Sequence, residues 1–258
     1  MFKNLFPVFG KGRILKKEML ENLRDYPRNY LDIYYKNYSD GIISGTELVI
    51  SENLITINEG IIKFNGKLYM LSDKLSIPYT YTNKEVLIKI RFLDETSDQD
   101  YKFSETRVYI DENPISEDSE LELGRFKLRE GAILRSKYQD FQDFSTEFNT
   151  INIISTNYAG IGKPTLNPLI LKYFSHIVFK NSSENSYDIG FAMQCINQEI
   201  INRDLILYYI SNRLGIGYKE YTNLEIYKHL TSIIRELESG IKRNTDVKQK
   251  RNTVIIVD

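Results

Sequence analysis

The sequence predicts an α+β fold with an N-terminal helical arm, an antiparallel β-sandwich or barrel-like module, and a C-terminal helical domain. Between residues 48 and 71, short runs alternate apolar and polar residues, a period typical of half-buried strands. Before this region and after residue 168, apolar residues recur every three or four positions, as on one face of a helix. We therefore divide the chain into an arm with helices (1–40), a β-module (41–145), a linker (146–168), and a helical domain with a basic tail and a terminal strand (169–258).

The first forty residues combine an extended terminus with helical spacing. Residues 1–13 are expected to be disordered or ordered by a partner, because they carry exposed apolar side chains: Phe2, Leu5, Phe6, Val8 and Phe9. From Arg13 the spacing is helical, and Pro27 is expected to end or restart the helix. A second apolar face follows, and it is rich in tyrosine: Tyr30, Leu31, Tyr34, Tyr35 and Tyr38.

The β-module contains a strong hairpin signal. Asn65-Gly66 separates two alternating runs, and both central residues of a type I′ turn need a positive φ. Gly41 and Gly45 suit sharp changes of direction where the chain enters the sheet. Further strands are expected at 85–93, 106–110 and 121–128, with an exposed acidic loop at 94–100. A meander of antiparallel strands is the expected product.

The last third of the chain is expected to be mainly helical. Residues 157–168 carry glycines and prolines with little periodicity, which makes them the best candidate for a linker. Apolar stripes between 196 and 214 predict a helix that is covered on more than one side. Thr222 and Glu225 form a capping box that opens the next helix. Basic residues at 242–251 and an apolar strand at 253–257 follow.

Composition excludes several classes of protein. The 258 residues carry a net charge of −1, which argues against a general nucleic-acid binder. The single cysteine, Cys195, forms no internal disulfide and is expected to be a buried, inert thiol. No signal peptide is expected because Pro7 and Gly10 interrupt the apolar terminus, and no apolar run approaches the roughly 20 residues that span a bilayer. Synthesis and folding in the cytoplasm are therefore expected.

No pattern in the sequence predicts a catalytic, metal or cofactor site. The segment Gly160-Ile-Gly162-Lys163 has the wrong glycine spacing for a phosphate loop and lacks the serine or threonine that would bind magnesium. The two histidines, His176 and His229, lie in unrelated segments, and we expect His176 to be a hydrogen-bonded core residue. Carboxylates for a glycosidase-like pair exist, but they are commonplace on the solvent faces of strands; they are Glu105, Asp111, Glu120 and Glu122. The chain is thus expected not to be an enzyme.

Three segments of the chain resemble a known protein family. Tyr38-Ser-Asp-Gly-Ile-Ile-Ser-Gly45, hereafter the Tyr38–Gly45 motif, is followed by a hairpin and by Glu59-Gly-Ile-Ile-Lys-Phe-Asn-Gly-Lys-Leu-Tyr-Met-Leu71. Together with Leu121-Glu-Leu-Gly-Arg-Phe-Lys-Leu-Arg-Glu-Gly131, this resembles baseplate and tail-fibre-attachment proteins of contractile phage tails and phage-tail-like bacteriocins, of the type found in Gram-positive prophages. The resemblance covers about residues 10–145 and rests on turns and strand faces rather than on site residues.

The resemblance implies a non-catalytic structural component that links a baseplate core to peripheral fibres or receptor-binding proteins. It implies wedge or hub proteins and a tail fibre as partners, several copies in a symmetric assembly, and neither membrane nor nucleic acid as a partner. The chain would be made in the bacterial cytoplasm and released on lysis as part of a phage tail or phage-tail-like particle. The segments expected to order on assembly contain Phe2, Phe6, Phe9, Tyr30, Tyr34, Tyr35, Val254, Ile255 and Ile256.

Two alternatives stay open. A glycan-binding, cell-wall-binding or hydrolysing module of the tail tip would need a cleft lined with aromatic residues and, for a hydrolase, two facing carboxylates. A nucleic-acid-binding protein would work through the basic tail at 242–251.

Overall fold

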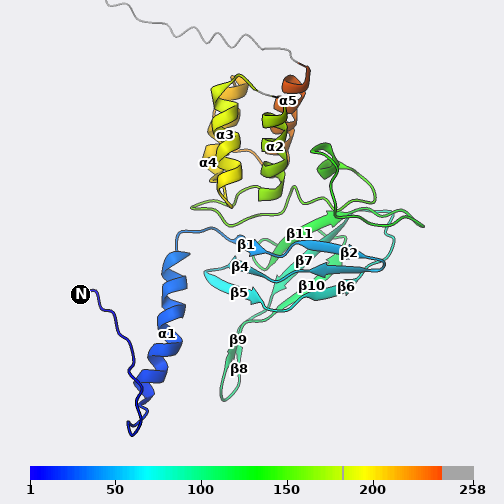
Figure 1. Cartoon of the computed structure of the whole chain (residues 1–258). Coiled ribbons are helices and arrows are strands. Elements are labelled where there is room, and N and C mark those ends of the chain that lie inside the picture. The colour runs from blue at the N-terminus through cyan, green and yellow to red at the C-terminus, as the bar shows by residue number, and fades with distance from the viewer. Residues whose placement is uncertain (182, 240–258) are drawn as a thin grey trace, which may run out of the picture.

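The computed structural model describes residues 1–181 and 183–239, and it confirms the α+β class (Figure 1). The basic tail at 242–251 and the terminal strand expected at 253–257 lie outside the described residues. The helices are α1 (Lys17–Tyr34), α2 (Pro168–Lys180), α3 (Ser186–Asn197), α4 (Arg203–Leu214) and α5 (Asn223–Ser239), with a short 3₁₀ helix at Gln142–Ser145. The strands are β1 (Gly41–Gly45), β2 (Leu48–Ser51), β3 (Leu54–Ile57), β4 (Gly60–Phe64), β5 (Lys67–Leu71), β6 (Leu75–Pro78), β7 (Val86–Phe92), β8 (Thr96–Ser97), β9 (Lys102–Phe103), β10 (Thr106–Asp111) and β11 (Glu120–Phe126).

The described strands form small open antiparallel sheets and no closed barrel. The sheet orders are β1-β4-β5, β2-β3-β6 and β10-β7-β11, with β8 and β9 as a separate two-stranded hairpin. The predicted turn between β4 and β5 is confirmed, since Asn65 and Gly66 have φ values of 46° and 73°. The acidic loop expected at 94–100 is exposed and carries part of the β8–β9 hairpin.

The sheets are held together by aromatic side chains from their inner faces. Phe64 of β4 stacks on Phe92 of β7 with ring centroids 3.8 Å apart, and Tyr69 of β5 meets the same Phe92 ring edge-on at 4.8 Å. Tyr79 meets Phe126 of β11 in the same edge-on manner at 6.0 Å. The two contacts of Phe92 join the sheet β1-β4-β5 to the sheet β10-β7-β11. These two sheets share no strand, so they pack against each other as in a β-sandwich.

Helices α2 to α5 stand together on one side of the sheets (Figure 1). The predicted capping box opens α5: the Thr222 N–H donates to Glu225 Oε2 at 2.7 Å, and the Glu225 N–H donates to Thr222 Oγ1 at 3.2 Å. The stripe expected to form one helix from 196 to 214 is divided, because α3 ends at Asn197 and the Asn202 side chain caps a new helix by accepting from the Asp204 N–H. Gly215 then ends α4 in the left-handed conformation.

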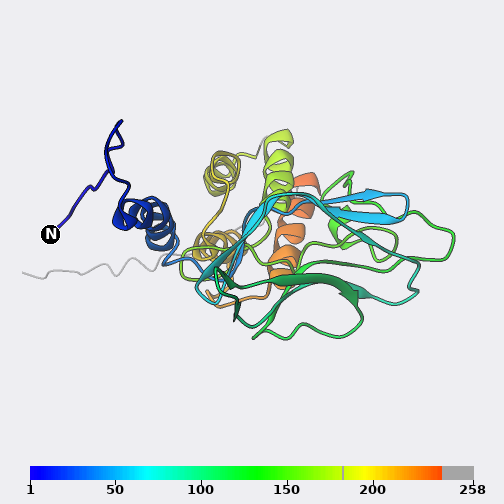
Figure 2. The same cartoon turned by 90° about the horizontal axis from the view of Figure 1, so that it is seen from below.

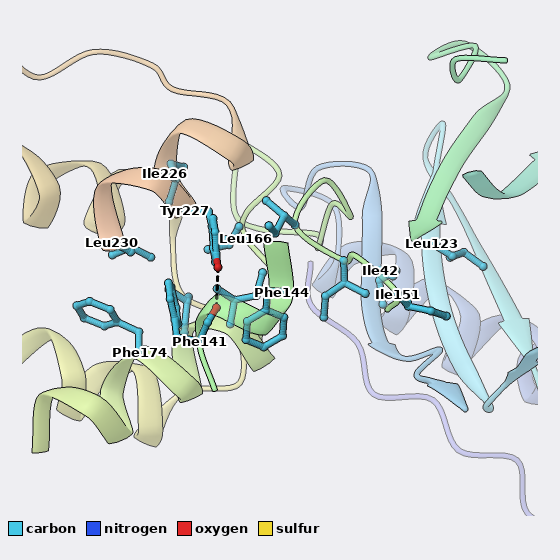
Figure 3. Packing of buried hydrophobic residues seen from close by; sticks show 14 of the residues in the cluster. Ile42, Leu123, Phe141, Phe144, Ile151, Leu166, Phe174, Ile226, Tyr227 and Leu230 are labelled. Atoms are coloured by element: carbon cyan, nitrogen blue, oxygen red, sulfur yellow. Dashed lines mark hydrogen bonds between the residues drawn. The ribbon is translucent and has the colours of Figure 1, made fainter. Parts of the chain in front are cut away.

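One continuous core joins the β-module to the helices. It runs from Ile42 in β1 to Ile234 in α5, and the intervening chain contributes Ile151 and Leu166, both fully buried. At its centre Phe141 stacks on Tyr227 of α5 at 4.9 Å, and the Tyr227 hydroxyl donates to the Phe141 carbonyl at 2.6 Å (Figure 3). Much of the segment expected as a linker (146–168) is therefore inside the structure, and the four-part division of the chain stays a prediction.

Two expectations about single residues have opposite outcomes. Cys195 is buried, as expected, and burial raises the pKa of its thiol to about 12. The expectation that His176 is a core residue is wrong, because His176 lies on the exposed face of α2. The apolar neighbours of His176 in the sequence, Phe174 and Val178, are the residues that face the core.

No helix among the described residues is both long and apolar enough to cross a bilayer.

Candidate assembly interface

Three carboxylates of the β-module that could be considered for acid–base chemistry, Asp111, Glu120 and Glu122, are held in ion pairs. Glu120 accepts hydrogen bonds from Arg91, from the Tyr109 hydroxyl and from the Ser116 N–H, and it lies 3.5 Å from Lys89. Burial by itself raises the pKa of Glu120, but these hydrogen bonds outweigh it and hold the pKa at about 2. A general acid at neutral pH needs the opposite shift.

Two of the other three carboxylates considered from the sequence, Asp111 and Glu122, are similarly engaged, whereas Glu105 is exposed. Hydrogen bonds from Asn113 and from Lys89 hold the pKa of Asp111 at about 2. Glu122 forms a two-point ion pair with Arg125, with nitrogen–oxygen distances of 2.8 and 2.7 Å. Among residues 1–181 and 183–239, no group of three or more His, Cys, Asp or Glu side chains is placed to hold a metal ion.

The Tyr38–Gly45 motif lies between α1 and the β-module and pairs with the segment that leads into α2. The Ile42 N–H donates to the Asn157 carbonyl at 3.0 Å, and the Ala159 N–H donates back to the Ile42 carbonyl at 2.8 Å. Three residues before Ile42, the Ser39 N–H donates to the Gly160 carbonyl at 2.8 Å. The segment at 157–160 thus pairs with the start of β1 and ties it to the chain that leads into α2.

The two glycines of the motif are required by close backbone packing. A Cβ atom on Gly41 would lie 2.8 Å from the Asn157 carbonyl oxygen, and one on Gly45 would lie 2.0 Å from the Glu59 carbonyl oxygen. Gly45 also has a φ of +69°, a region that side-chain-bearing residues rarely adopt. Contact with segments that are distant in sequence therefore requires glycine at both positions, and the sharp turns expected there stay a prediction.

A buried lysine fixes the end of α1 to the sheet. Lys63 of β4 is 7% exposed, and its Nζ donates to the carbonyls of Tyr35, at 2.7 Å, and of Tyr38. A third carbonyl, that of Lys36, lies at 3.3 Å. These carbonyls follow the last turn of α1, where the helix presents unpaired acceptors and partial negative charge. The base of α1 is thereby held rigidly on the β-module.

Beyond this base, α1 is largely exposed within the described part of the chain. None of its 18 residues is buried, and the apolar side chains predicted to lie on its faces are open to solvent. Tyr30 and Tyr34 are 62% and 57% exposed, and their rings stack on each other at 6.1 Å. Tyr34 and Tyr35 meet edge-on at 4.9 Å. Three of the predicted interface residues are thus brought together in one row of tyrosine rings at the base of the helix.

α1 is weak as an isolated element. Pro27 lies inside the helix, where we expected a break, and a proline in a helix interior costs about 3 kcal/mol. Helices of this length are marginal in water unless an apolar face is packed against something. No residue of α1 is buried in the described chain, so packing of an apolar face adds little to the stability of this helix.

The N-terminal arm, residues 1–13, is equally uncovered. Phe2, Phe6 and Phe9 are 107%, 84% and 55% exposed in the described chain. Both views place the arm on the side of α1 that faces away from the β-module (Figures 1 and 2). The remaining predicted interface residues, Val254, Ile255 and Ile256, lie outside the described residues. The interface assignment as a whole stays a prediction.

Sequence patterns did not indicate three residues that shape this region. Lys63 is a charged residue in strand β4, and its burial depends on the carbonyls at the end of α1 that its ammonium group contacts. Thr46 has a φ of +63°, which is unusual for a β-branched residue. Asn157 lies in the stretch that seemed to be a linker. Gly41 and Gly45 were the only sequence feature that indicated tight packing in this region. They did not indicate which segments pack against them.

Comparisons with known proteins give a partial structural likeness. A structure described as "Crystal structure of TssK" has a TM-score of 0.40 and 12% sequence identity, and the match covers 92% of this chain and 70% of that chain. A cryo-electron microscopy structure of the type VI secretion system TssK-TssF-TssG baseplate subcomplex has a TM-score of 0.41 and 8% identity, covering 93% of this chain and 100% of that chain. No protein-family model and no curated protein matches the chain. At these scores the likeness defines neither the family nor the role of this chain.

Proposed function

We propose that this chain is a non-catalytic structural component of a contractile-tail baseplate, and that it links the baseplate core to peripheral fibres or receptor-binding proteins. The proposal is supported by the resemblance of the Tyr38–Gly45 motif and of the following hairpin to baseplate and fibre-attachment proteins. It extends to wedge or hub proteins as neighbours, to several copies per particle, and to release with the particle on lysis.

One observation carries the proposal. α1 is anchored at its base by Lys63, yet none of its 18 residues is buried. A rigid base combined with an uncovered apolar helix is the arrangement of an element that becomes ordered against a neighbour. The arm before it extends the same surface with Phe2, Phe6 and Phe9.

The non-catalytic assignment is supported by the state of the carboxylates. Glu120 and Asp111 have depressed pKa values and several hydrogen-bond donors each, so they are permanent ions that hold the sheet together. A glycan-hydrolysing module would instead need one carboxylic acid that stays protonated near neutral pH.

Gene deletion followed by electron microscopy of the tails tests the proposal. We expect tails with incomplete baseplates or without fibres, and normal tails bearing fibres would overturn the proposal. Complementation then locates the surface. The doubly substituted chain Tyr30→Ser, Tyr34→Ser should fail to restore the tails, whereas Tyr101→Ser should restore them. Tyr101 is a matched control, because it is 68% exposed but lies beside the β8–β9 hairpin.

A further inference from the structure

Strand β10 (Thr106–Asp111) forms one edge of the sheet β10-β7-β11. It pairs with β7 along its whole length in a regular register without a bulge. The Leu93 N–H donates to the Glu105 carbonyl at 2.9 Å where this pairing begins, and hydrogen-bonded pairs recur at every second residue of an antiparallel ladder. The alternate residues of β10 therefore point their backbone N–H and C=O groups away from β7. They are Thr106, Val108 and Ile110.

The free edge of β10 forms no backbone hydrogen bond with any other described segment. The other edges are closed or shorter. β1 exchanges backbone hydrogen bonds with residues 157–159, and β11 exchanges them with Asn152 at 2.7 and 2.9 Å. β2 and β6 have four residues each, and β5 has five and begins with Lys67. With six residues, β10 is the longest open edge among the described strands, and a long regular edge is a template for pairing with another strand.

The side chains of β10 alternate between two faces of the sheet. Val108 and Ile110 are half-buried and pack against the core. Arg107, Tyr109 and Asp111 lie on the opposite face. Asp111 is a permanent anion, because the hydrogen-bond donors around it hold its pKa at about 2. Arg107 is exposed and forms no ion pair within the described part of the chain, so β10 carries a cation near its start and an anion at its end.

We infer that β10 pairs antiparallel with β10 of a second copy of the chain, about a two-fold axis at Tyr109. In this register each Arg107 lies opposite the partner's Asp111, and each Val108 lies opposite the partner's Ile110. The outward N–H and C=O groups of the two strands then meet in hydrogen-bonded pairs. Opposite charges and apolar side chains that lie directly across a ladder also stabilise the pairing. Two three-stranded sheets are thereby joined into one continuous sheet.

Neighbouring registers are less complementary. The outward groups of both strands stay opposite each other only when one strand slides by two residues at a time. A slide of two residues in one direction places Glu105 opposite the partner's Asp111, and like charges directly opposite each other are destabilising. The same slide in the other direction places Arg107 opposite the partner's Asn113, so the charge pair is lost. The register centred on Tyr109 is therefore favoured.

This edge is complementary to itself, and this favours a second copy over a different partner. A two-fold contact uses the same surface of both subunits, so one strand must supply both members of each opposed pair. β10 does so with one cation, one anion and two apolar residues. The inference does not rest on the proposed function, because two copies of this chain suffice for the pairing.

Disulfide cross-linking between two substituted chains tests the register. The full-length chain with Arg107→Cys is mixed with the full-length chain with Asp111→Cys, and the mixture is oxidised mildly. We expect a disulfide between the two chains, because opposite residues at a non-hydrogen-bonded position lie within the span of a disulfide. Neither chain alone should form it, because identical positions are then four residues apart along the ladder. The native Cys195 does not compete, since it is buried.

Two further substitutions guard against a failure of one chain to fold. Tyr109→Cys places a thiol at the two-fold axis, so this chain alone should form a disulfide-linked dimer. Lys74→Cys is the control, at an exposed position outside β10, and it should form no disulfide with the Arg107→Cys chain. Disulfides from the Arg107→Cys chain alone, or none from either the mixture or the Tyr109→Cys chain, would overturn the inference.

Charge reversal tests the pairing without a cross-link. Arg107→Glu places a carboxylate opposite the partner's Asp111, and it should raise the dimer dissociation constant in sedimentation experiments about tenfold or more. Lys74→Glu makes the same change of charge outside β10 and should leave the constant unchanged. A wild-type chain that stays monomeric, or a dimer that Arg107→Glu leaves intact, would overturn the inference. Normal tails bearing fibres after gene deletion would overturn the proposed function and leave this result unaffected.

Discussion

The chain before Tyr38 and the chain after it are stabilised in different ways. After Tyr38, one core of buried residues runs from Ile42 to Ile234 and joins sheets, connecting segments and helices. Before it, the 37 residues that include all of α1 contribute no buried side chain. The boundary falls at the Tyr38–Gly45 motif, where Lys63 and two closely packed glycines hold the two parts together. The comparison indicates that the buried core that stabilises the chain lies in the second part, and we propose that association with other proteins depends on the first.

The largest expected effect comes from the motif itself. Gly45→Ala places a Cβ atom 2.0 Å from the Glu59 carbonyl oxygen, at a φ of +69°. We expect a loss of more than about 4 kcal/mol in the free energy of unfolding, because backbone atoms cannot move aside cheaply. Gly66→Ala is the matched control: its φ is +73°, but nothing lies within 4 Å, so we expect a loss of about 1 kcal/mol. Urea denaturation of both variants checks this, and equal losses would contradict the packing explanation.

The buried ion cluster of the β-module should have the next largest effect. Glu120→Gln leaves Lys89, which is 1% exposed, and Arg91 without their shared carboxylate. We expect a loss of about 3 kcal/mol at pH 7, as measured by urea denaturation. Glu95→Gln breaks an exposed ion pair with Lys67 and should leave stability unchanged within error.

The same variant predicts a pH dependence with a definite sign. The pKa of Glu120 lies at about 2 in the folded chain and near the ordinary value of 4.5 in the unfolded chain. Its stabilisation is therefore fully present above pH 4.5 and is lost as pH falls from 4.5 toward 2. The stability gap between wild type and Glu120→Gln should stay constant from pH 7 to 5 and narrow below that. A gap that widens on acidification would contradict this.

The anchor of α1 should have a smaller effect, and a local one. Lys63→Met leaves the carbonyls of Tyr35 and Tyr38 without their ammonium donor, and we expect a loss of about 2 kcal/mol. Hydrogen–deuterium exchange should show faster exchange at residues 35–38, while β7 stays unchanged. Lys67→Met, on an exposed neighbouring position, is the control. Uniform acceleration over the whole chain would show that Lys63 supports the core and not the anchor.

The arm should have the smallest effect on stability. The triple variant Phe2→Ser, Phe6→Ser, Phe9→Ser removes rings that are mostly exposed in the described chain, so the free energy of unfolding should change by less than about 0.5 kcal/mol. A large loss of stability would place the arm inside the fold of the single chain.

Local patterns predicted local structure well in this protein. The Asn65-Gly66 turn and the Thr222–Glu225 capping box both depend on a few adjacent residues, and both are confirmed. The same reasoning failed at Pro27, which α1 tolerates, and at His176, whose apolar neighbours face the core while it faces solvent.

Features that depend on distant residues could not be predicted. Residues 157–160 look like a linker, and only their pairing with Ser39 and Ile42 shows why they are ordered. Lys63 and Lys89 are buried because carbonyls or carboxylates from other segments surround their ammonium groups. The spacing of residues along the sequence does not indicate these contacts.

The division between a stable part and an associating part is tested most directly by hydrogen–deuterium exchange of the free chain and of the chain in its assembled particle. We predict that the amides of residues 2–34 exchange fast in the free chain and become protected in the particle. Those of the exposed β8–β9 hairpin (Thr96–Phe103) should exchange equally in both. Equal exchange of residues 2–34 in the two states, with protection elsewhere, would contradict the account.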